Sequence, residues 1–117
     1  MDLREILSNR KTIFLKEPLI KMLFGSSTRT RVIYRKVGKD SDEYKYYRDL
    51  LMNQLKSAGF VPVSTERFGP GEVQTWLSSA GVIELFLNPT GEEGPNIRVD
   101  GLDRIEPFSV IAVAHSF

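Results

Sequence analysis

The chain lacks cysteine altogether and contains a single histidine. Without thiols it has no disulfide bonds and no thiolate zinc site, so a secreted scaffold held together by disulfides is excluded. One histidine also leaves little material for acid–base catalysis. This residue, His115, follows a short apolar run near the end of the chain, where a structural role is the more common one.

Long hydrophobic runs are missing as well. The most apolar stretch, Val110–Ala114, has the length of one strand, whereas a membrane-spanning helix needs about 20 residues. Residues 1–5 mix acidic and basic side chains, and no apolar run follows them, so this segment does not resemble a secretory signal. These absences favour a cytoplasmic protein with no membrane partner.

What the sequence does contain is typical of a folded protein. The 117 residues are 41% hydrophobic and 26% charged, which is enough for one core but not for two. We therefore expect a single α+β domain over residues 1–117, in which residues 1–11 form a short helix or an arm.

The clearest periodic pattern predicts a helix over about residues 41–58. Asp40 or Ser41 can cap its start, and acidic side chains in the first turn suit the positive end of the helix dipole. Apolar residues then recur at steps of three and four, and Gly59 can adopt the left-handed conformation that commonly ends a helix. The expected buried stripe consists of Tyr44, Tyr47, Leu50, Leu51, Met52, Leu55 and Ala58.

Alternating and β-branched segments predict strands on both sides of this helix. Thr28–Val37 precedes it, and Phe60–Glu66 follows it at a sheet edge, because Pro62 removes one backbone donor. A strand–helix–strand connection allows these two strands to run parallel in one sheet. Three later strands are expected to form an antiparallel meander, at Val82–Asn88, Asn96–Gly101 and Phe108–Phe117.

Other segments have weaker signals. Residues 73–80 fit a short helix, but Gln74-Thr75-Trp76 favours a strand and the turn residues that follow favour a hairpin. Short helices are expected at residues 2–9 and 18–24. The predicted fold class is therefore α+β, with one dominant helix on a mixed, mostly antiparallel sheet of four to six strands and a short helical N-terminal region.

Charge is distributed unevenly along the chain, although the net charge is only +1. Residues 1–60 carry 13 Lys and Arg against 7 Asp and Glu, whereas residues 61–117 carry 3 against 8. A segregated field of this kind attracts polyanions to the basic half, or pairs the two halves of neighbouring copies.

The basic strand Thr28–Val37 is the best candidate for a nucleic-acid interface. Arginine offers a planar fork of donors to phosphate and stacks on bases, and strict alternation would place Arg29, Arg31 and Arg35 on one face. Single-stranded or structure-recognised nucleic acid is favoured, with little base readout, because no helix-turn-helix, zinc-finger or RNA-recognition consensus occurs. The candidate residues are Arg10, Lys11, Phe14, Phe24, Arg29, Arg31, Tyr34, Arg35, Lys36 and Lys39.

Three alternatives compete with this hypothesis. Basic side chains also protect a sheet edge without binding anything. The basic and acidic halves of two copies could pair, which would make the chain a protein-interaction module or a homodimer. Finally, the carboxylates of Glu84, Asp100, Asp103 and Glu106 could hold Mg²⁺ in a nuclease, although no lysine lies in the same half of the chain.

Motifs for other chemistry are absent from the sequence. Gly69-Pro70-Gly71 lacks the lysine and hydroxyl residues of a phosphate-binding loop, and the serines lie in no nucleophile-elbow setting. We therefore expect a binding domain that has no catalytic residue, no metal site and no cofactor.

Overall fold

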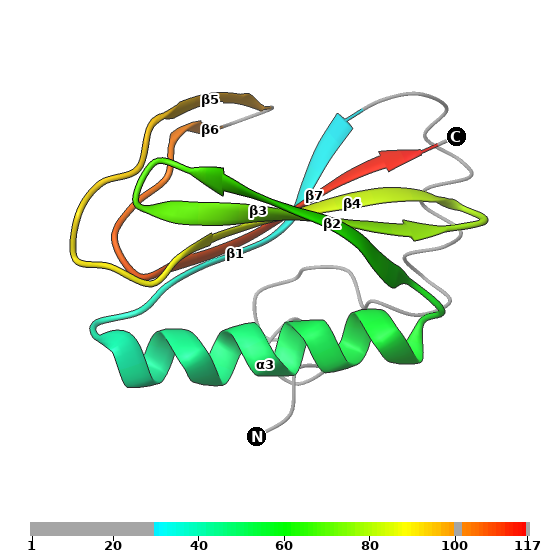
Figure 1. Ribbon diagram of the computed structural model, residues 1–117, viewed down its shortest axis with the longest axis horizontal. Coiled ribbons are helices and arrows are strands. Elements are labelled where there is room, and N and C mark those ends of the chain that lie inside the picture. The colour runs from blue at the N-terminus through cyan, green and yellow to red at the C-terminus, as the bar shows by residue number, and fades with distance from the viewer. Residues whose placement is uncertain (1–29, 100–101, 117) are drawn as a thin grey trace.

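The computed structural model describes residues 30–99 and 102–116, and the helices expected at residues 2–9 and 18–24 lie outside these ranges. A five-stranded sheet with the order β1-β7-β4-β3-β2 forms the middle layer. Helix α3 covers one face, and a two-stranded ribbon, β5 and β6, covers part of the other face (Figure 1). The α+β prediction is confirmed. The elements are β1 (Thr30–Val37), α3 (Ser41–Ser57), β2 (Val61–Phe68), β3 (Gly71–Ser78), β4 (Gly81–Asn88), β5 (Asn96–Val99), β6 (Leu102–Arg104) and β7 (Ser109–Ser116).

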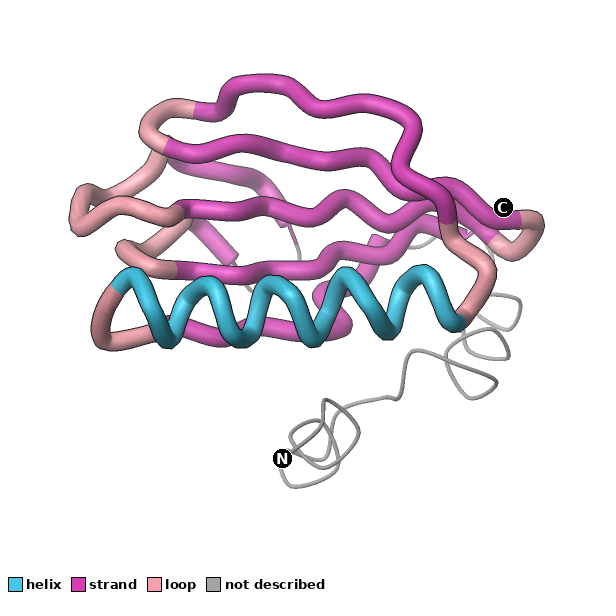
Figure 2. The backbone as a smooth tube through the Cα atoms, turned by 60° about the horizontal axis from the view of Figure 1, so that its bottom comes forward, coloured by secondary structure: helices cyan, strands magenta, loops and turns pink. Residues whose placement is uncertain are grey.

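Every paired strand in the sheet runs antiparallel to its neighbour. β1 and β2 point in the same direction, as their connection through α3 predicted, but they lie at opposite edges and form no parallel pair. Figure 2 shows β2 as the upper rim of the sheet. The edge position predicted from Pro62 is therefore confirmed, and residues 73–78, for which a helix was the alternative, belong to strand β3.

Helix α3 begins and ends as the sequence predicts. The Asp40 carboxylate accepts a hydrogen bond from the Glu43 amide at 2.9 Å, which satisfies one of the free amides of the first turn. At the other end, Gly59 has a φ of 90°, which glycine adopts without strain. The predicted stripe faces the sheet, with Tyr44, Leu51 and Leu55 buried.

The sheet is buried on both faces in its centre, which explains why β4 and β7 are almost continuously apolar. Alternate residues of β4, including Ile83 and Leu85, pack toward α3. Phe86 lies on the opposite face, which we call the ribbon face, and packs with Ile97 and Ile105 of the ribbon region.

The predicted meander through residues 96–101 is wrong. β4 pairs directly with β7, and β5 instead pairs with β6 in a separate two-stranded sheet. The local strand pattern did not reveal this, because the decisive interaction is the cover that Ile97 and Ile105 provide for Phe86, Ile111 and Val113 across the sheet.

A bulge interrupts the alternation of β1 between Val32 and Tyr34. Ile33 and Tyr34 both join the core under α3, whereas Val32 packs on the ribbon face. The strict alternation expected for this strand, which would put Ile33 on the face of Arg35, is therefore wrong, because the extra residue shifts the register of every position that follows it.

Within the described ranges, no helix has the length and apolar character that crossing a membrane requires.

Candidate functional site

Two basic side chains of β1 are engaged by acidic neighbours. Arg35 forms an ion pair with Glu106, which lies in the segment between β6 and β7. Lys36 approaches Glu43 of α3, with 3.4 Å between Nζ and Oε1, and its ammonium lies 4.7 Å from the centre of the Tyr47 ring. Both cations therefore hold parts of the fold together.

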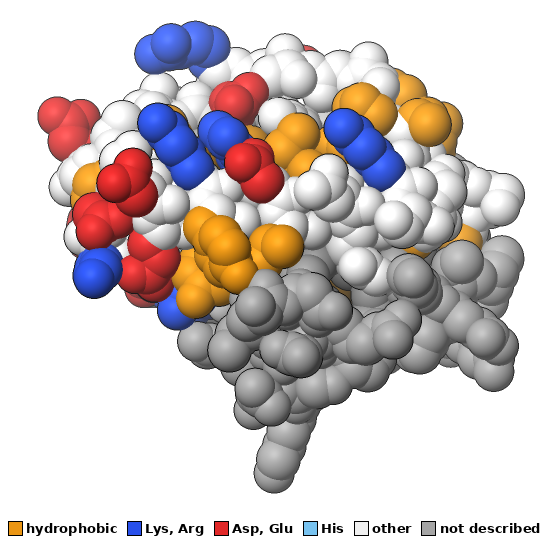
Figure 3. Space-filling model, turned by 90° about the horizontal axis from the view of Figure 1, so that it is seen from below, with side chains coloured by type: hydrophobic (Ala, Val, Ile, Leu, Met, Phe, Trp, Pro, Cys, Tyr) orange, Lys and Arg blue, Asp and Glu red, His pale blue; other side chains and the backbone are white. Residues whose placement is uncertain are grey.

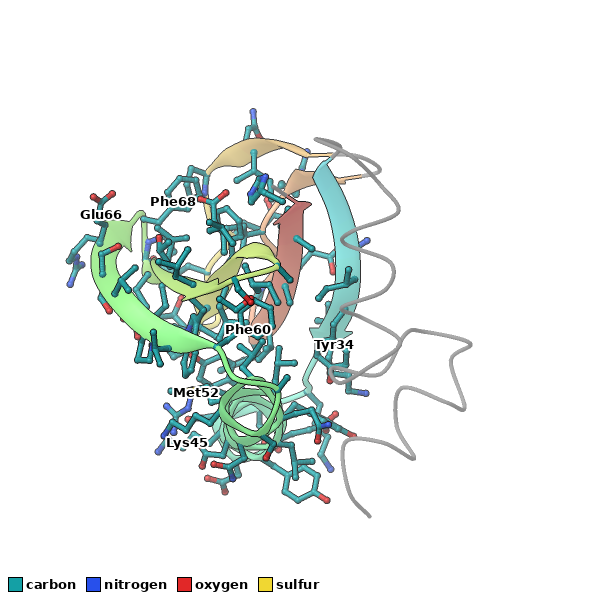
Figure 4. All side chains as sticks on the ribbon, turned by 90° about the vertical axis from the view of Figure 1, so that its right-hand side faces the viewer. Tyr34, Lys45, Met52, Phe60, Glu66 and Phe68 are labelled. Carbon is teal, nitrogen blue, oxygen red and sulfur yellow. The ribbon has the colours of Figure 1, made fainter. Side chains whose placement is uncertain are left out.

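Other predicted nucleic-acid contacts are also limited by the structure. Tyr34 is only 2% exposed and packs in the core beneath β1, so it cannot stack on a base in this conformation (Figure 4). Lys39 is exposed in the turn before α3. The backbone of Arg31 pairs with Ala114, while its side chain lies outside the described part. The remaining predicted contacts, Arg10, Lys11, Phe14, Phe24 and Arg29, also lie outside the described residues.

The described residues carry nearly equal numbers of basic and acidic side chains. Residues 30–99 and 102–116 contain ten Lys and Arg and eleven Asp and Glu. Figure 3, which views the molecule from the α3 side, shows acidic and basic side chains interspersed over the described atoms. The positive excess of the sequence therefore comes from outside the described part.

The acidic side chains of the nuclease alternative have separate partners. Glu84 lies 2.5 Å from Nε2 of His115 on the neighbouring strand β7, and Glu106 pairs with Arg35. Asp100 and the side chain of Asp103 lie outside the described part. Among the described residues, no three His, Asp or Glu side chains are grouped closely enough to hold a metal ion.

The exposed edge of the sheet at β2 is the feature that offers a binding surface. β2 is the last strand of the sheet, and each of its residues except Phe68 is exposed. Val61 and Val63 are both 55% exposed, a high fraction for valine. A strand edge of this kind presents unpaired backbone donors and acceptors to a partner.

The β2–β3 hairpin is held in place by close backbone contacts. Gly69 has a φ of 62° at the first position of the two-residue turn, where glycine is preferred. A Cβ atom on Gly71 would lie 2.0 Å from the carbonyl oxygen of Leu87, and one on Gly69 would lie 2.5 Å from Cδ of Pro95. Glycine therefore lets the hairpin pack directly on the end of β4 and on the loop that follows it.

A hollow of about 380 Å³ lies beside this hairpin. Glu66, Arg67 and Glu72 supply its charged side chains, and no ion pair or hydrogen bond to their side chains occurs among the described residues. Figure 4 shows Glu66 pointing away from β2 and Phe68 pointing inward, where it packs edge-to-face on Phe86. The lining residues are Thr65, Glu66, Arg67, Pro70, Gly71, Glu72 and Pro89.

No family model, curated protein or solved structure matches this chain. Its function must therefore be inferred from the geometry of its own residues.

One wall of the hollow is fixed by a buried asparagine. Asn88 donates hydrogen bonds to the carbonyl oxygens of Glu92 and Glu106, and it accepts two more from Thr90. All of its side-chain groups are thus used, so the loop that contains Pro89 is anchored at its root. These hydrogen bonds fix the position of this wall.

The negative charge of Glu72 also affects the pKa of a core residue, Tyr44. Burial raises the pKa of Tyr44 to about 12; Arg48 opposes this shift, and Glu72 adds to it. Alternation along β3 places Glu72 on the same face as Trp76, which packs in the core under α3, and Arg67 lies opposite Glu72 on that face.

The sequence indicated the edge but not the hollow. Pro62 marks β2 as an edge strand, whereas Gly69-Pro70-Gly71 has no feature in the sequence that points to a hollow beside it. The hollow requires Pro89, which follows another strand, and no local pattern relates Pro89 to β2. Likewise, the pairing of Glu84 with His115 depends on β4 lying beside β7.

Proposed function

We propose that this chain is a protein-interaction module that binds an extended peptide segment along the edge of β2. The observation that carries the proposal is the exposed strand edge beside a preformed hollow that holds unpaired charges. Strand addition of this kind takes its affinity from backbone hydrogen bonds and its specificity from the side chains beside the edge. A cytoplasmic location, expected from the lack of cysteine, is part of the proposal.

The register of the hairpin predicts which backbone groups are available. Residues that flank a two-residue hairpin turn normally exchange hydrogen bonds, and bonded and non-bonded pairs then alternate along the strands. Phe68 and Gly71 flank this turn, and Thr65 and Arg67 fall at the non-bonded positions. Thr65 and Arg67 are therefore expected to direct their N–H and C=O groups toward the peptide.

The other half of β2 limits the length of the interface. Pro62 has no backbone N–H, and a bulge interrupts the register between Pro62 and Ser64. Both features oppose continuous pairing. The peptide-binding edge therefore consists of Ser64–Phe68, which is long enough for a specific contact and too short to promote open-ended aggregation.

A phage-displayed library of random linear peptides, selected on the immobilised full chain, tests this proposal. Peptides that bind the wild type should also bind Thr65→Val, which keeps the backbone N–H, and should lose affinity for Thr65→Pro, which removes it. Circular dichroism and thermal unfolding establish that both variants are folded.

A measurement on the unmodified protein makes the test independent of the proline variant. Addition of a selected peptide should slow amide hydrogen exchange at Thr65 and Arg67, since these amides become hydrogen-bonded. Equal binding to Thr65→Pro, unchanged exchange at both amides, or the failure to select any peptide would overturn the proposal.

Nucleic-acid binding remains a second proposal, supported by the excess of Lys and Arg in residues 1–60. Because the described basic side chains are balanced by acids, this function would depend mainly on Arg10, Lys11 and Arg29, together with exposed Lys39. Phosphate contacts by such residues release counterions, so the affinity must fall steeply with salt.

Fluorescence anisotropy with labelled single- and double-stranded oligonucleotides at low and high salt tests the second proposal. Replacing Arg10, Lys11, Arg29 and Lys39 together by alanine should abolish binding, whereas replacing Arg35, which pairs with Glu106, should leave it nearly unchanged. An absence of binding at low salt would reject nucleic acid as the partner.

A further inference from the structure

We infer that the peptide bound at β2 runs antiparallel to it, because every neighbouring pair of strands in this sheet is antiparallel and this pairing is the more stable one, and that it carries an acidic residue followed directly by a basic residue. This inference rests on the proposed function and specifies the chemistry of the partner. It follows from two adjacent charges on the binding edge, Glu66 and Arg67, and from the faces of the sheet to which they belong.

The strand register assigns these two residues to opposite faces. Glu66 lies opposite Val73, which packs on the ribbon face, whereas Arg67 lies opposite Glu72 on the α3 face. In an added strand, directly opposed residues share a face and their side chains interact. An antiparallel peptide therefore places a Lys or Arg opposite Glu66 and, one position earlier in its sequence, an Asp or Glu opposite Arg67.

The charged residues that line the hollow belong to both faces of the sheet. Glu66 lies on the ribbon face, where it meets the basic residue of the peptide, whereas Arg67 lies beside Glu72 on the α3 face, where it meets the acidic residue. Pro70 and Pro89 add apolar surface for the alkyl part of a long basic side chain. Glu66 thus supplies the opposite charge for Lys or Arg, and the two prolines supply apolar surface for its stem.

The same geometry argues against a second copy of this chain as the partner. In a two-fold antiparallel pair of β2 strands, a register centred on Glu66 or on Arg67 brings identical charges face to face. A register centred on Thr65 places both charges opposite uncharged residues. Glu66 and Arg67 never face each other across such a pair, because they lie on opposite faces of the sheet. A peptide from a different protein can place an opposite charge against both Glu66 and Arg67.

Two synthetic β-prone peptides that differ only in the order of one dipeptide test the inference. One contains Glu-Lys at its centre and the other contains Lys-Glu, and each is titrated against the full chain by fluorescence anisotropy. Because two favourable cross-strand ion pairs form only with the Glu-Lys order, this peptide should bind roughly fivefold more tightly than the Lys-Glu peptide. In the charge-exchanged variant Glu66→Lys/Arg67→Glu, the preference should reverse.

The matched control is Lys45→Glu/Asp49→Lys, which exchanges two exposed charges of α3 and also preserves the net charge. It should bind both peptides as the wild type does. Equal affinity of the two peptides, a preference for Lys-Glu, or an unchanged preference in the Glu66/Arg67 variant would overturn the inference. A dimeric mass by light scattering that falls to the monomer value in Thr65→Pro would identify a second copy as the partner instead.

Failure of the inference is distinguishable from failure of the proposed function. If library-selected peptides protect the amides of Thr65 and Arg67 but lack the charge order, the edge is a binding site of different specificity. If no peptide, selected or synthetic, protects these amides, the proposed function itself is rejected.

Discussion

The ionisation of the Tyr44 side chain is coupled to the stability of the folded protein. Tyr44 lies on the side of α3 that packs against the sheet. Its burial raises its pKa to about 12, because a phenolate loses hydration there. The guanidinium of Arg48 lies 5.7 Å from the centre of the ring and offsets part of this effect. The ring therefore stays neutral at pH values where an exposed tyrosine would ionise.

The raised pKa predicts a loss of stability in alkali. In the unfolded chain Tyr44 ionises near its ordinary pKa of 10, whereas in the folded chain it holds its proton to about pH 12. The folded protein therefore loses stability as the pH rises from about 10 to about 12, and the loss that Tyr44 contributes reaches about 2 kcal/mol. Urea unfolding at several pH values should show a shallower alkaline decline for Tyr44→Phe than for the wild type.

Tyr46→Phe is the control for this titration, because Tyr46 is exposed on the same helix. Its stability profile should follow that of the wild type. An identical alkaline decline in wild type and Tyr44→Phe would show that Tyr44 ionises no later in the folded state than in the unfolded one.

At the scale of an element, α3 owes its start to one side chain. The capping residue Asp40 stands between the end of β1 and the first helical turn, and Asp42 and Glu43 add negative charge at the positive end of the helix dipole. The amide of Gly38 bonds to the carbonyl of Phe108 at 2.7 Å, which joins this turn to the segment before β7. The cap therefore positions the helix relative to the sheet as well as stabilising it.

Two substitutions of Asp40 distinguish the stabilisation by its capping hydrogen bond from the stabilisation by its negative charge. Asp40→Ala should lower the free energy of unfolding by about 1 kcal/mol, whereas Asp40→Asn should retain most of it, because the amide oxygen accepts the same bond. Urea unfolding at neutral pH measures both. Equal losses in the two variants would assign the effect to the charge of Asp40 and not to its hydrogen bond with the Glu43 amide.

At the scale of the whole molecule, the sheet is covered by different elements on its two faces. Helix α3 packs over the side that contains Trp76, and the ribbon covers Phe86, Ile111 and Val113 on the other side. The ribbon is small, so a few apolar side chains must hold it in place. β2 extends to the exposed edge of this arrangement, where the proposed peptide site lies.

This organisation predicts unequal effects of similar truncations. Ile105→Ala removes a buried contact of the ribbon and should destabilise the protein by about 2–4 kcal/mol. Val61→Ala, at the exposed edge, should change the stability by less than about 0.5 kcal/mol. Urea unfolding of both variants measures this contrast, and a small loss for Ile105→Ala would mean that the ribbon does not stabilise the sheet.

Local signals were sufficient for most elements but not for the candidate site. The helix was predictable because its cap, its apolar stripe and Gly59 lie within one continuous segment. The edge position of β2 was predictable because Pro62 removes a donor whatever its surroundings. By contrast, the interpretation of Arg35 and Lys36 as nucleic-acid ligands depended on their being unpaired, and their acidic partners lie elsewhere in the chain.

The amino-acid sequence by itself determined the α+β class, the limits of α3, the edge character of β2 and the uneven charge along the chain. Each depends on residue type or short-range spacing. The tertiary structure alone decided that β4 pairs with β7, that the ribbon forms a third layer, and that Pro89 borders one hollow with Glu66 and Arg67. These features join residues that are distant in sequence. They depend on side-chain burial and strand register, which cannot be recognised within any single segment.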